Sequence, residues 1–384
     1  MPTKRYLFTP GPTPVPPQVL VALSEPVLHH RAPDFRAVYE RVLQRLREVH
    51  RTESDVLLFT CSGTGAFESA LVNLCSPGER VLAVSFGNFG ERWATLGRTF
   101  GLEVEELRLP WGADPSPDDL AQKLRGIDPV SLVLLVHSET STGVVADVQA
   151  LAAVAKEAGA LVVVDAVSSL GAVPLEMDAW GLDVVIAGSQ KALMTPPGLA
   201  TAAVSEAAWA QVERATLPRF YFDWRRTRKA QQKLDSAFTP AVSLVVALDA
   251  ALGLLLEDGL DAVCERHVRL GRACRAGLKA MGLELFSPDD DTAAVVTAAR
   301  MPEGIPASRL TLALRDRHGI TIAGGQGPLK DEIFRIGHIG WFDEFDIATA
   351  LSAVELVLAD LGAPVERGIA AARALDAYAN GVRV

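Results

Sequence analysis

Short apolar runs that alternate with helical stretches are the feature that most limits how this chain can fold. The runs are continuous and rich in β-branched residues, as in Leu161–Val164 and Asp183–Gly188. A strand that is apolar at consecutive positions is buried on both faces, and parallel strands need a crossover, usually a helix, between them. The pattern predicts an α/β fold in three layers, with a mainly parallel, mixed sheet between helices. We expect its strands at 56–61, 80–84, 102–107, 131–136, 161–165, 183–188 and 199–204.

The sequence pattern changes after Pro240. Helical patterns at 242–257, 260–281, 307–317, 345–361 and 364–379 are mixed with short strands at 293–298, 320–323 and 333–337. This mixture predicts a smaller α+β domain. The first 17 residues contain six prolines, which favour an extended arm over a helix. We therefore expect an N-terminal arm over residues 1–20, a large domain over 21–250 and a small C-terminal domain over 251–384.

Charge and cysteine content exclude several classes of partner and of binding site. The 384 residues include 37 Lys and Arg against 47 Asp and Glu, a net charge of −10, so a nucleic-acid partner is not expected. The basic cluster 225–229 is interpreted as a solvated helix face. No apolar stretch is long enough to span a bilayer, so no membrane partner is expected. The four cysteines lack CxxC spacing, which predicts no metal site and a reducing, cytoplasmic environment.

Two ionisable residues follow neighbouring predicted strands. Asp165 ends the run that starts at Leu161, and Lys191 follows Gly188 by three residues. Taken singly, the aspartate could cap a helix or form a turn, and the lysine could lie at the surface. Ligands bind at the carboxyl ends of such strands, and a desolvated lysine is a nucleophile for carbonyl groups. Together the two residues fit a pyridoxal phosphate site, with the lysine as Schiff base and the aspartate beside the pyridine nitrogen.

The segment Cys61–Ala66 joins a predicted strand to a predicted helix. Its glycines remove side-chain bulk, its serine and threonine supply hydroxyls, and the helix start offers unpaired N–H groups. These features predict a phosphate cradle, although an ordinary structural turn is the alternative. Glu68 stands where a dinucleotide-binding fingerprint needs its third glycine, and the GK[ST] of a P-loop is absent.

Arg335 lies inside the short apolar strand 333–337. A guanidinium group in such a position needs an anionic partner, and its fork suits a carboxylate bound through two hydrogen bonds. The partner could belong to a substrate or to an internal salt bridge.

Seven motifs stand in order along the chain. They are PGPTPVPP (10–17), SGTGAFE (62–68), ETSTG (139–143), VDAVSSLG (164–171), GSQKALMTPPG (188–198), FTPAVSL (238–244) and FRIGHIG (334–340). Together they resemble the class V aminotransferases, which are fold type I pyridoxal phosphate enzymes. The similarity is greatest to the alanine–glyoxylate and serine–glyoxylate (serine–pyruvate) group and extends from about residue 5 to 361.

The resemblance implies roles around the cofactor ring. Lys191 matches the Schiff-base lysine, which also moves a proton between Cα and C4′, and Asp165 matches the partner of the pyridine nitrogen. Thr140 matches a side chain near the phenolic oxygen. Phe89 stands where the family places an aromatic ring that stacks on the cofactor, often a tryptophan.

The resemblance also implies phosphate and substrate contacts. Ser62, Gly63 and Thr64 match the phosphate cradle, Gln190 matches a further phosphate contact, and Thr239 matches a contact that comes from the partner subunit. Relatives often have a tyrosine at the position of Ser236, for which Tyr221 or Arg225 could compensate. Arg335 matches the clamp on the substrate α-carboxylate, and Gly11 and Pro12 match the part of the arm that lines the substrate pocket. His29–Arg31 could also line it.

These matches imply a homodimeric transaminase that uses pyridoxal 5′-phosphate. We expect ping-pong transfer of an amino group from alanine or serine to glyoxylate or pyruvate through Lys191, because only one arginine is clearly placed for substrate. Aspartate, 2-aminoethylphosphonate and ureidoglycine remain alternative donors. A cysteine desulfurase is not expected, because residues 282–335 contain no cysteine. A non-catalytic subunit of the same fold, such as a hydrogenase-associated one, is the competitor from another class.

Overall fold

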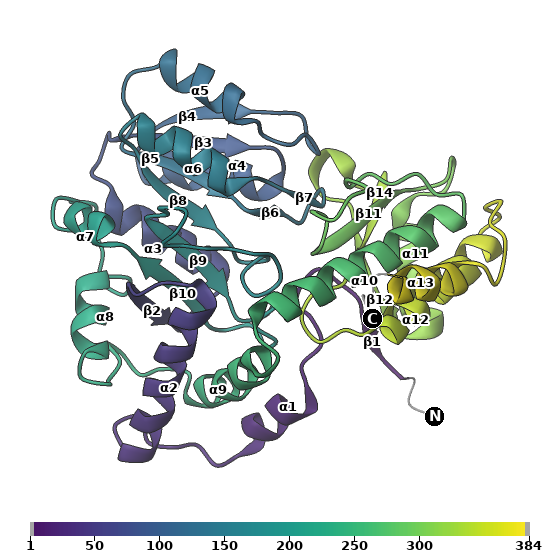
Figure 1. Ribbon diagram of the computed structural model, residues 1–384, viewed down its shortest axis with the longest axis horizontal. Coiled ribbons are helices and arrows are strands. Elements are labelled where there is room, and N and C mark those ends of the chain that lie inside the picture. Colours follow the sequence, from purple (N-terminus) through teal and green to yellow (C-terminus); the bar gives the residue numbers. More distant parts are fainter. Residues whose placement is uncertain (1–3, 381–384) are drawn as a thin grey trace.

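A seven-stranded sheet forms the centre of the larger part of the molecule. The computed structural model describes residues 4–380 and is shown in Figure 1. The strand order is β2-β10-β9-β8-β5-β3-β4, and only β10 runs antiparallel to its neighbours. The strands are β2 (Asp55–Phe59), β3 (Arg80–Ser85), β4 (Glu103–Arg108), β5 (Leu132–Val136), β8 (Leu161–Asp165), β9 (Val184–Gly188) and β10 (Ala200–Val204). The predicted mixed sheet and all seven of its strands are confirmed.

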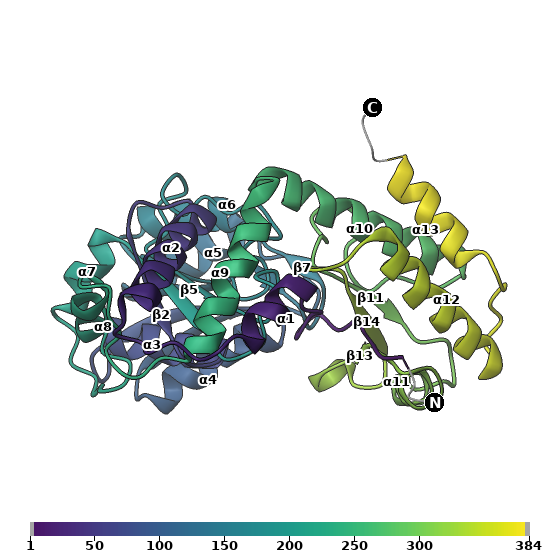
Figure 2. The same cartoon turned by 90° about the horizontal axis from the view of Figure 1, so that it is seen from below.

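Helices cover both sides of this sheet. In Figure 2, α3 (Gly63–Leu74) and α4 (Asn88–Thr99) lie on one side, and α5 (Pro117–Arg125) and α6 (Val148–Glu157) lie on the other. The remaining helices of this part are α1 (Pro17–Ser24), α2 (Pro33–His50), α7 (Glu206–Val212), α8 (Trp224–Gln231) and α9 (Val242–Glu257). Helix α1 begins inside the predicted arm, because prolines are tolerated in the first turn of a helix.

A three-stranded sheet forms the centre of the smaller part. Its order is β11-β14-β13 and all its pairs are antiparallel. The elements here are α10 (Leu260–Ala280), β11 (Val296–Arg300), α11 (Ala307–His318), β12 (Ile320–Thr321), β13 (Ala323–Gly324), the 3-10 turn η1 (Gly327–Leu329), β14 (Ile333–Gly337), α12 (Glu344–Asp360) and α13 (Ala370–Ala379). The predicted strand 320–323 is divided into β12 and β13, and β11 begins three residues later than predicted.

Two large clusters of buried apolar residues lie in these two parts. One gathers residues from Val19 to Val263, and the other gathers Phe8 together with residues from Leu270 to Ala374. Helix α10 contributes Val263 to the first cluster and Leu270 to the second. Figure 2 shows this helix running from the larger part of the molecule to the smaller one. The division of the chain into domains at about residue 250 stays a prediction.

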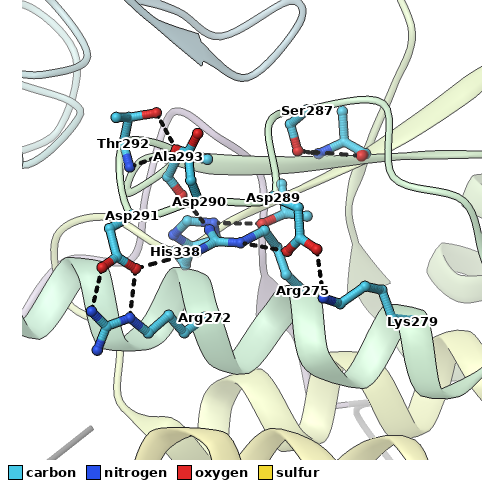
Figure 3. A network of polar contacts seen from close by, with 12 residues as sticks. Arg272, Arg275, Lys279, Ser287, Asp289, Asp290, Asp291, Thr292, Ala293 and His338 are labelled. Carbon is cyan, nitrogen blue, oxygen red and sulfur yellow. Dashed lines mark hydrogen bonds and ion pairs between the residues drawn. The ribbon is translucent and has the colours of Figure 1, made fainter.

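A network of charged side chains fixes the loop that precedes β11 (Figure 3). Arg272 of α10 pairs with Asp291, and Lys279 pairs with Asp289. The buried Arg275 donates to the carbonyl oxygen of Ala293 over 2.9 Å. This loop is therefore held along α10. No helix within residues 4–380 is long and apolar enough to cross a membrane.

The N-terminal arm joins the two parts of the molecule. Its strand β1 (Tyr6–Leu7) pairs in parallel with β12. The N–H of Gly337, at the end of β14, donates to the carbonyl oxygen of Phe8 over 2.8 Å. Farther along, the N–H of Thr13 donates to the carbonyl oxygen of Gln190 over 3.1 Å. The arm thus connects the β14 strand with the turn that follows β9.

Candidate active site

The carboxyl ends of the parallel strands meet at one edge of the large sheet. The segments that follow β2, β3, β8 and β9 all come to this edge, where they surround a cavity of about 270 Å³. Its lining is Gly11, Pro12, Ser62, Gly63, Thr64, Phe67, Phe89, Arg92, Asp165, Val167, Ser168, Gln190, Lys191 and Pro197. The structure therefore brings together nine of the twelve residues predicted for the site, all except Thr140, Thr239 and Arg335.

Lys191 is buried in the turn that follows β9. Its Nζ donates to the carbonyl oxygen of Pro10 over 2.7 Å, and its own carbonyl oxygen accepts from the Thr13 hydroxyl over 3.0 Å. Burial lowers the pKa of the Lys191 ammonium group to about 8; the charge of Asp165 opposes this shift, and those of Arg335 and Arg92 add to it. The lysine is therefore held by the arm and has a larger neutral fraction near pH 7 than an exposed lysine.

Asp165 is buried at the end of β8. Its Oδ1 accepts a hydrogen bond from the N–H of Val167 over 2.8 Å. This is the kind of turn contact that the sequence also allowed for Asp165. Burial raises the pKa of the Asp165 carboxyl to about 7; the Val167 N–H opposes this shift and Glu139 adds to it. The other oxygen makes no hydrogen bond within residues 4–380. A cationic ring nitrogen placed there would stabilise the carboxylate, which agrees with the predicted partner of a pyridine nitrogen.

The first turn of α3 has the features of an anion site. The side chain of Ser62 does not cap this helix, so the N–H groups at its start lack a side-chain acceptor. A Cβ at Gly63 would lie 2.9 Å from Val167, so the close approach of these segments requires glycine. The amide Oε1 of Gln190 is buried without a hydrogen-bond partner. These residues fit the phosphate of pyridoxal phosphate, and Lys191 and Asp165 fit its aldehyde and its ring nitrogen.

Sequence reasoning missed two charged residues beside Phe89. Glu139 is fully buried, and its carboxylate accepts from the N–H groups of Phe89 over 2.8 Å and Gly90 over 3.1 Å, at the start of α4. Arg92 lies one helical turn after Phe89, and its guanidinium is 4.6 Å from the centre of that ring. Helical spacing from Phe89 could have indicated Arg92, which is a second arginine at the site. Nothing in the sequence pattern indicated that Glu139 caps α4.

Arg335 is buried on the central strand of the small sheet. Its Nε and Nη2 donate to the carbonyl oxygen of Gly324 over 2.9 and 2.7 Å, and its Nη1 donates to that of Thr140 over 2.6 Å. A guanidinium has five N–H donors, so one on each Nη is left over. Burial lowers the pKa of Arg335 to about 10, and Glu139 opposes this shift. No carboxylate within residues 4–380 forms an ion pair with it, so the structure does not show the internal salt bridge considered above.

Thr239 lies away from the cavity. It lines a separate small pocket before α9, together with Ser236 and Tyr221. The Ser236 hydroxyl is buried there without a partner, and the Tyr221 hydroxyl donates to a backbone carbonyl of the same chain. Arg225 pairs with Asp223. The lining of the cavity does not include the segment 29–31.

Thr140, whose carbonyl oxygen accepts the hydrogen bond from Arg335, lies in the segment between β5 and α6. Strands β6 (Ser138–Glu139) and β7 (Val144–Val145) form a hairpin whose turn contains Thr140. The hydrogen bond from Arg335 to Thr140 therefore joins the small sheet to the edge of the large one.

Comparison with known proteins identifies close relatives along almost the whole chain. The aminotransferase class-V family model matches residues 5–330. The chain is 44% identical over 365 residues to the soluble hydrogenase 42 kDa subunit of Anabaena cylindrica, which covers 94% of this chain and 95% of that one. It is 35% identical over 384 residues to the serine–glyoxylate aminotransferase of Methylorubrum extorquens, covering 97% and 96%.

A solved structure agrees with this result. The ureidoglycine–glyoxylate aminotransferase of Bacillus subtilis matches the present structure with a TM-score of 0.94 at 31% identity, over 99% of both chains. The names of the three relatives differ in the amino donor or in the activity altogether. The comparisons therefore agree on the fold and the family and differ on the substrate.

Proposed function

Because the chain belongs to the class V aminotransferases, which are pyridoxal phosphate-dependent transaminases, we propose that it transfers the amino group of alanine or serine to glyoxylate or pyruvate in two half-reactions. The observation that carries this proposal is the buried Arg335, whose two remaining N–H donors have no hydrogen-bond partner among residues 4–380. Such a pair suits the α-carboxylate that every amino acid and 2-oxo acid substrate shares.

The two ionisable residues of the cavity have separate tasks in this proposal. When bound, the cofactor supplies an electron sink for the negative charge that develops at the substrate Cα. Lys191 is the general base that takes the Cα proton of the amino donor in the first half-reaction and delivers a proton to the Cα derived from the oxo acid in the second. Its lowered pKa provides the neutral amine near pH 8. Asp165 remains ionised beside the ring nitrogen and holds that nitrogen protonated.

The arrangement of the arginines favours a small neutral donor. Arg335 is proposed for the α-carboxylate, and Arg92 is held by Phe89 and Thr64 beside the phosphate cradle. Neither guanidinium is then left for a distal carboxylate, which an aspartate donor would need. The relative named serine–glyoxylate aminotransferase supports a small neutral donor. The relative named ureidoglycine–glyoxylate aminotransferase supports ureidoglycine as the alternative donor.

We also propose that the active enzyme is a homodimer with shared sites. Thr239 is predicted to contact the phosphate of the partner subunit, and its position outside the cavity of its own chain supports this role. Exposed apolar side chains at Leu20, Val21, Val27 and Phe220 are available for a subunit interface.

The four unpaired cysteines support a reducing, cytoplasmic compartment.

Visible absorbance of the purified protein tests the proposal. The spectrum is recorded with added pyridoxal phosphate, before and after L-alanine, L-serine, L-aspartate or 2-aminoethylphosphonate is supplied. We expect a visible band that alanine or serine bleaches, with aspartate much slower. A band that only aspartate or the phosphonate bleaches would contradict the proposed donor. A band that no donor bleaches would favour a non-catalytic role.

A further inference from the structure

Arg92 brings a positive charge into the cavity and forms no ion pair within residues 4–380; Asp165 acts on it only from beyond ion-pair distance. It is one of two cationic residues that line the cavity, and the other, Lys191, is held by the carbonyl oxygen of Pro10. No acidic group in residues 4–380 lies within ion-pair distance of the Arg92 guanidinium. That group stands 4.6 Å from the ring centre of Phe89 and 5.9 Å from that of Phe67. The two aromatic rings hold the guanidinium in place and leave its charge unpaired.

Among residues 4–380 the Arg92 side chain makes one hydrogen bond, and it determines how the Thr64 hydroxyl is oriented. Its Nη1 donates to the Thr64 Oγ1 over 3.1 Å, so this oxygen is an acceptor there and its own proton must be donated elsewhere. Thr64 lies in the first turn of α3, where no side chain caps the helix. An anion at this turn would gain the Thr64 hydroxyl, the backbone N–H groups and the nearby guanidinium charge.

We propose that Arg92 is the positioning residue of the phosphate cradle. It orients the Thr64 hydroxyl as a donor to the phosphate of the cofactor, and it supplies the positive charge that the cradle itself lacks. Through Phe89 the same guanidinium also links the cradle to the aromatic ring predicted to stack on the cofactor. This inference rests on the proposed assignment of Ser62, Gly63 and Thr64 to the phosphate.

The test compares a ligand that has the phosphate with one that lacks it. The probes are pyridoxamine 5′-phosphate and pyridoxamine, which bind without forming a bond to Lys191. Their dissociation constants are measured by calorimetry on cofactor-free protein. We expect Arg92→Gln to weaken pyridoxamine 5′-phosphate about tenfold, the typical effect of one lost charge-assisted hydrogen bond, and to leave pyridoxamine unchanged. Arg92→Lys, which keeps the charge but loses the planar fork, should fall between the two.

Two further variants make the result specific. Thr64→Val removes the hydroxyl. The loss of affinity in the double variant with Arg92→Gln should be smaller than the sum of the two single losses, because each single variant already removes the Arg92–Thr64 contact. Arg98→Gln is the matched control, since Arg98 is on the same helix but is exposed and pairs with Glu106. It should bind both probes as the original chain does. Thermal melting of each variant shows whether it is folded.

Three outcomes would overturn the inference. Arg92→Gln could bind pyridoxamine 5′-phosphate unchanged, or it could weaken both probes equally, which would indicate a role through ring stacking alone. It could also leave both probes unchanged and raise the KM for aspartate, which would indicate a substrate clamp. Failure of the proposed function looks different, because the original chain would then bind pyridoxamine 5′-phosphate but transfer no amino group from alanine or serine. If the cofactor assignment itself failed, the original chain would bind neither probe.

Discussion

The contact between Gly11 and Lys191 leads to a sharp prediction for Gly11→Ala. Gly11 has a φ of +142°, and a Cβ built there would lie 2.3 Å from both Cε and Nζ of Lys191. Ordinary contacts begin at 3.4 Å, so the end of the lysine would have to move by about 1 Å. A displacement of this size at a reacting group costs about 100-fold in rate. We therefore expect transamination by this variant to fall about 100-fold.

The matched control for this variant is Gly78→Ala. Gly78 also has a positive φ, +74°, but a Cβ there would meet no atom within 4 Å. Both variants carry backbone strain of about 1–3 kcal/mol, so both should melt a few degrees lower. Only Gly11→Ala should lose activity, measured as kcat with the best donor and saturating cofactor. Equal activity of the two variants would refute the position of the Lys191 side chain against the arm.

Three further predictions follow from the pKa values and contacts at the site. With added pyridoxal phosphate, Lys191→Ala should show only the absorbance of the free aldehyde and lack the lysine-bound band of the original chain. It should still bind pyridoxamine 5′-phosphate within about tenfold of the original chain, measured by calorimetry. The rate at which cofactor-free protein captures pyridoxal phosphate should rise with pH through about 8, because the neutral amine is the nucleophile and the pKa of Lys191 is about 8; a midpoint near 10 would contradict this. Arg335→Ala should raise the donor KM about 100-fold, the scale of a lost charge-assisted pair, with pyridoxamine 5′-phosphate affinity unchanged.

The large sheet could be predicted because its strands are buried on both faces. A run such as Leu132–Val136 is apolar at every position, so its sequence leaves little choice of structure. Helix α2 was missed although its buried residues follow helical spacing, as at Phe35, Tyr39 and Val42. The division of 320–323 into two strands could not be predicted, because β12 pairs with β1, more than 300 residues earlier in the chain.

The meeting of most predicted site residues in one cavity could be predicted for the same reason as the sheet. Asp165, Lys191 and the segment 62–64 follow strands that end at one edge, so the topology alone brings them together. The contact of Arg335 with Thr140 joins residues 195 positions apart in different sheets. Such a contact depends on how the two parts of the molecule pack, which no local pattern contains.

The N-terminal arm contacts both β14, near the C-terminal end of the chain, and Lys191 in the cavity. Phe8 accepts a hydrogen bond from Gly337, which is two residues from Arg335 on β14, and Pro10 accepts one from Lys191. A backbone path of three residues, from 8 to 10, therefore joins β14, which carries the proposed carboxylate clamp Arg335, to Lys191. Pro10 restricts the backbone of this segment, because its ring fixes φ. In the proposed function the arm contributes to catalysis by positioning, because Arg335 and Lys191 would both act on atoms attached to the same Cα.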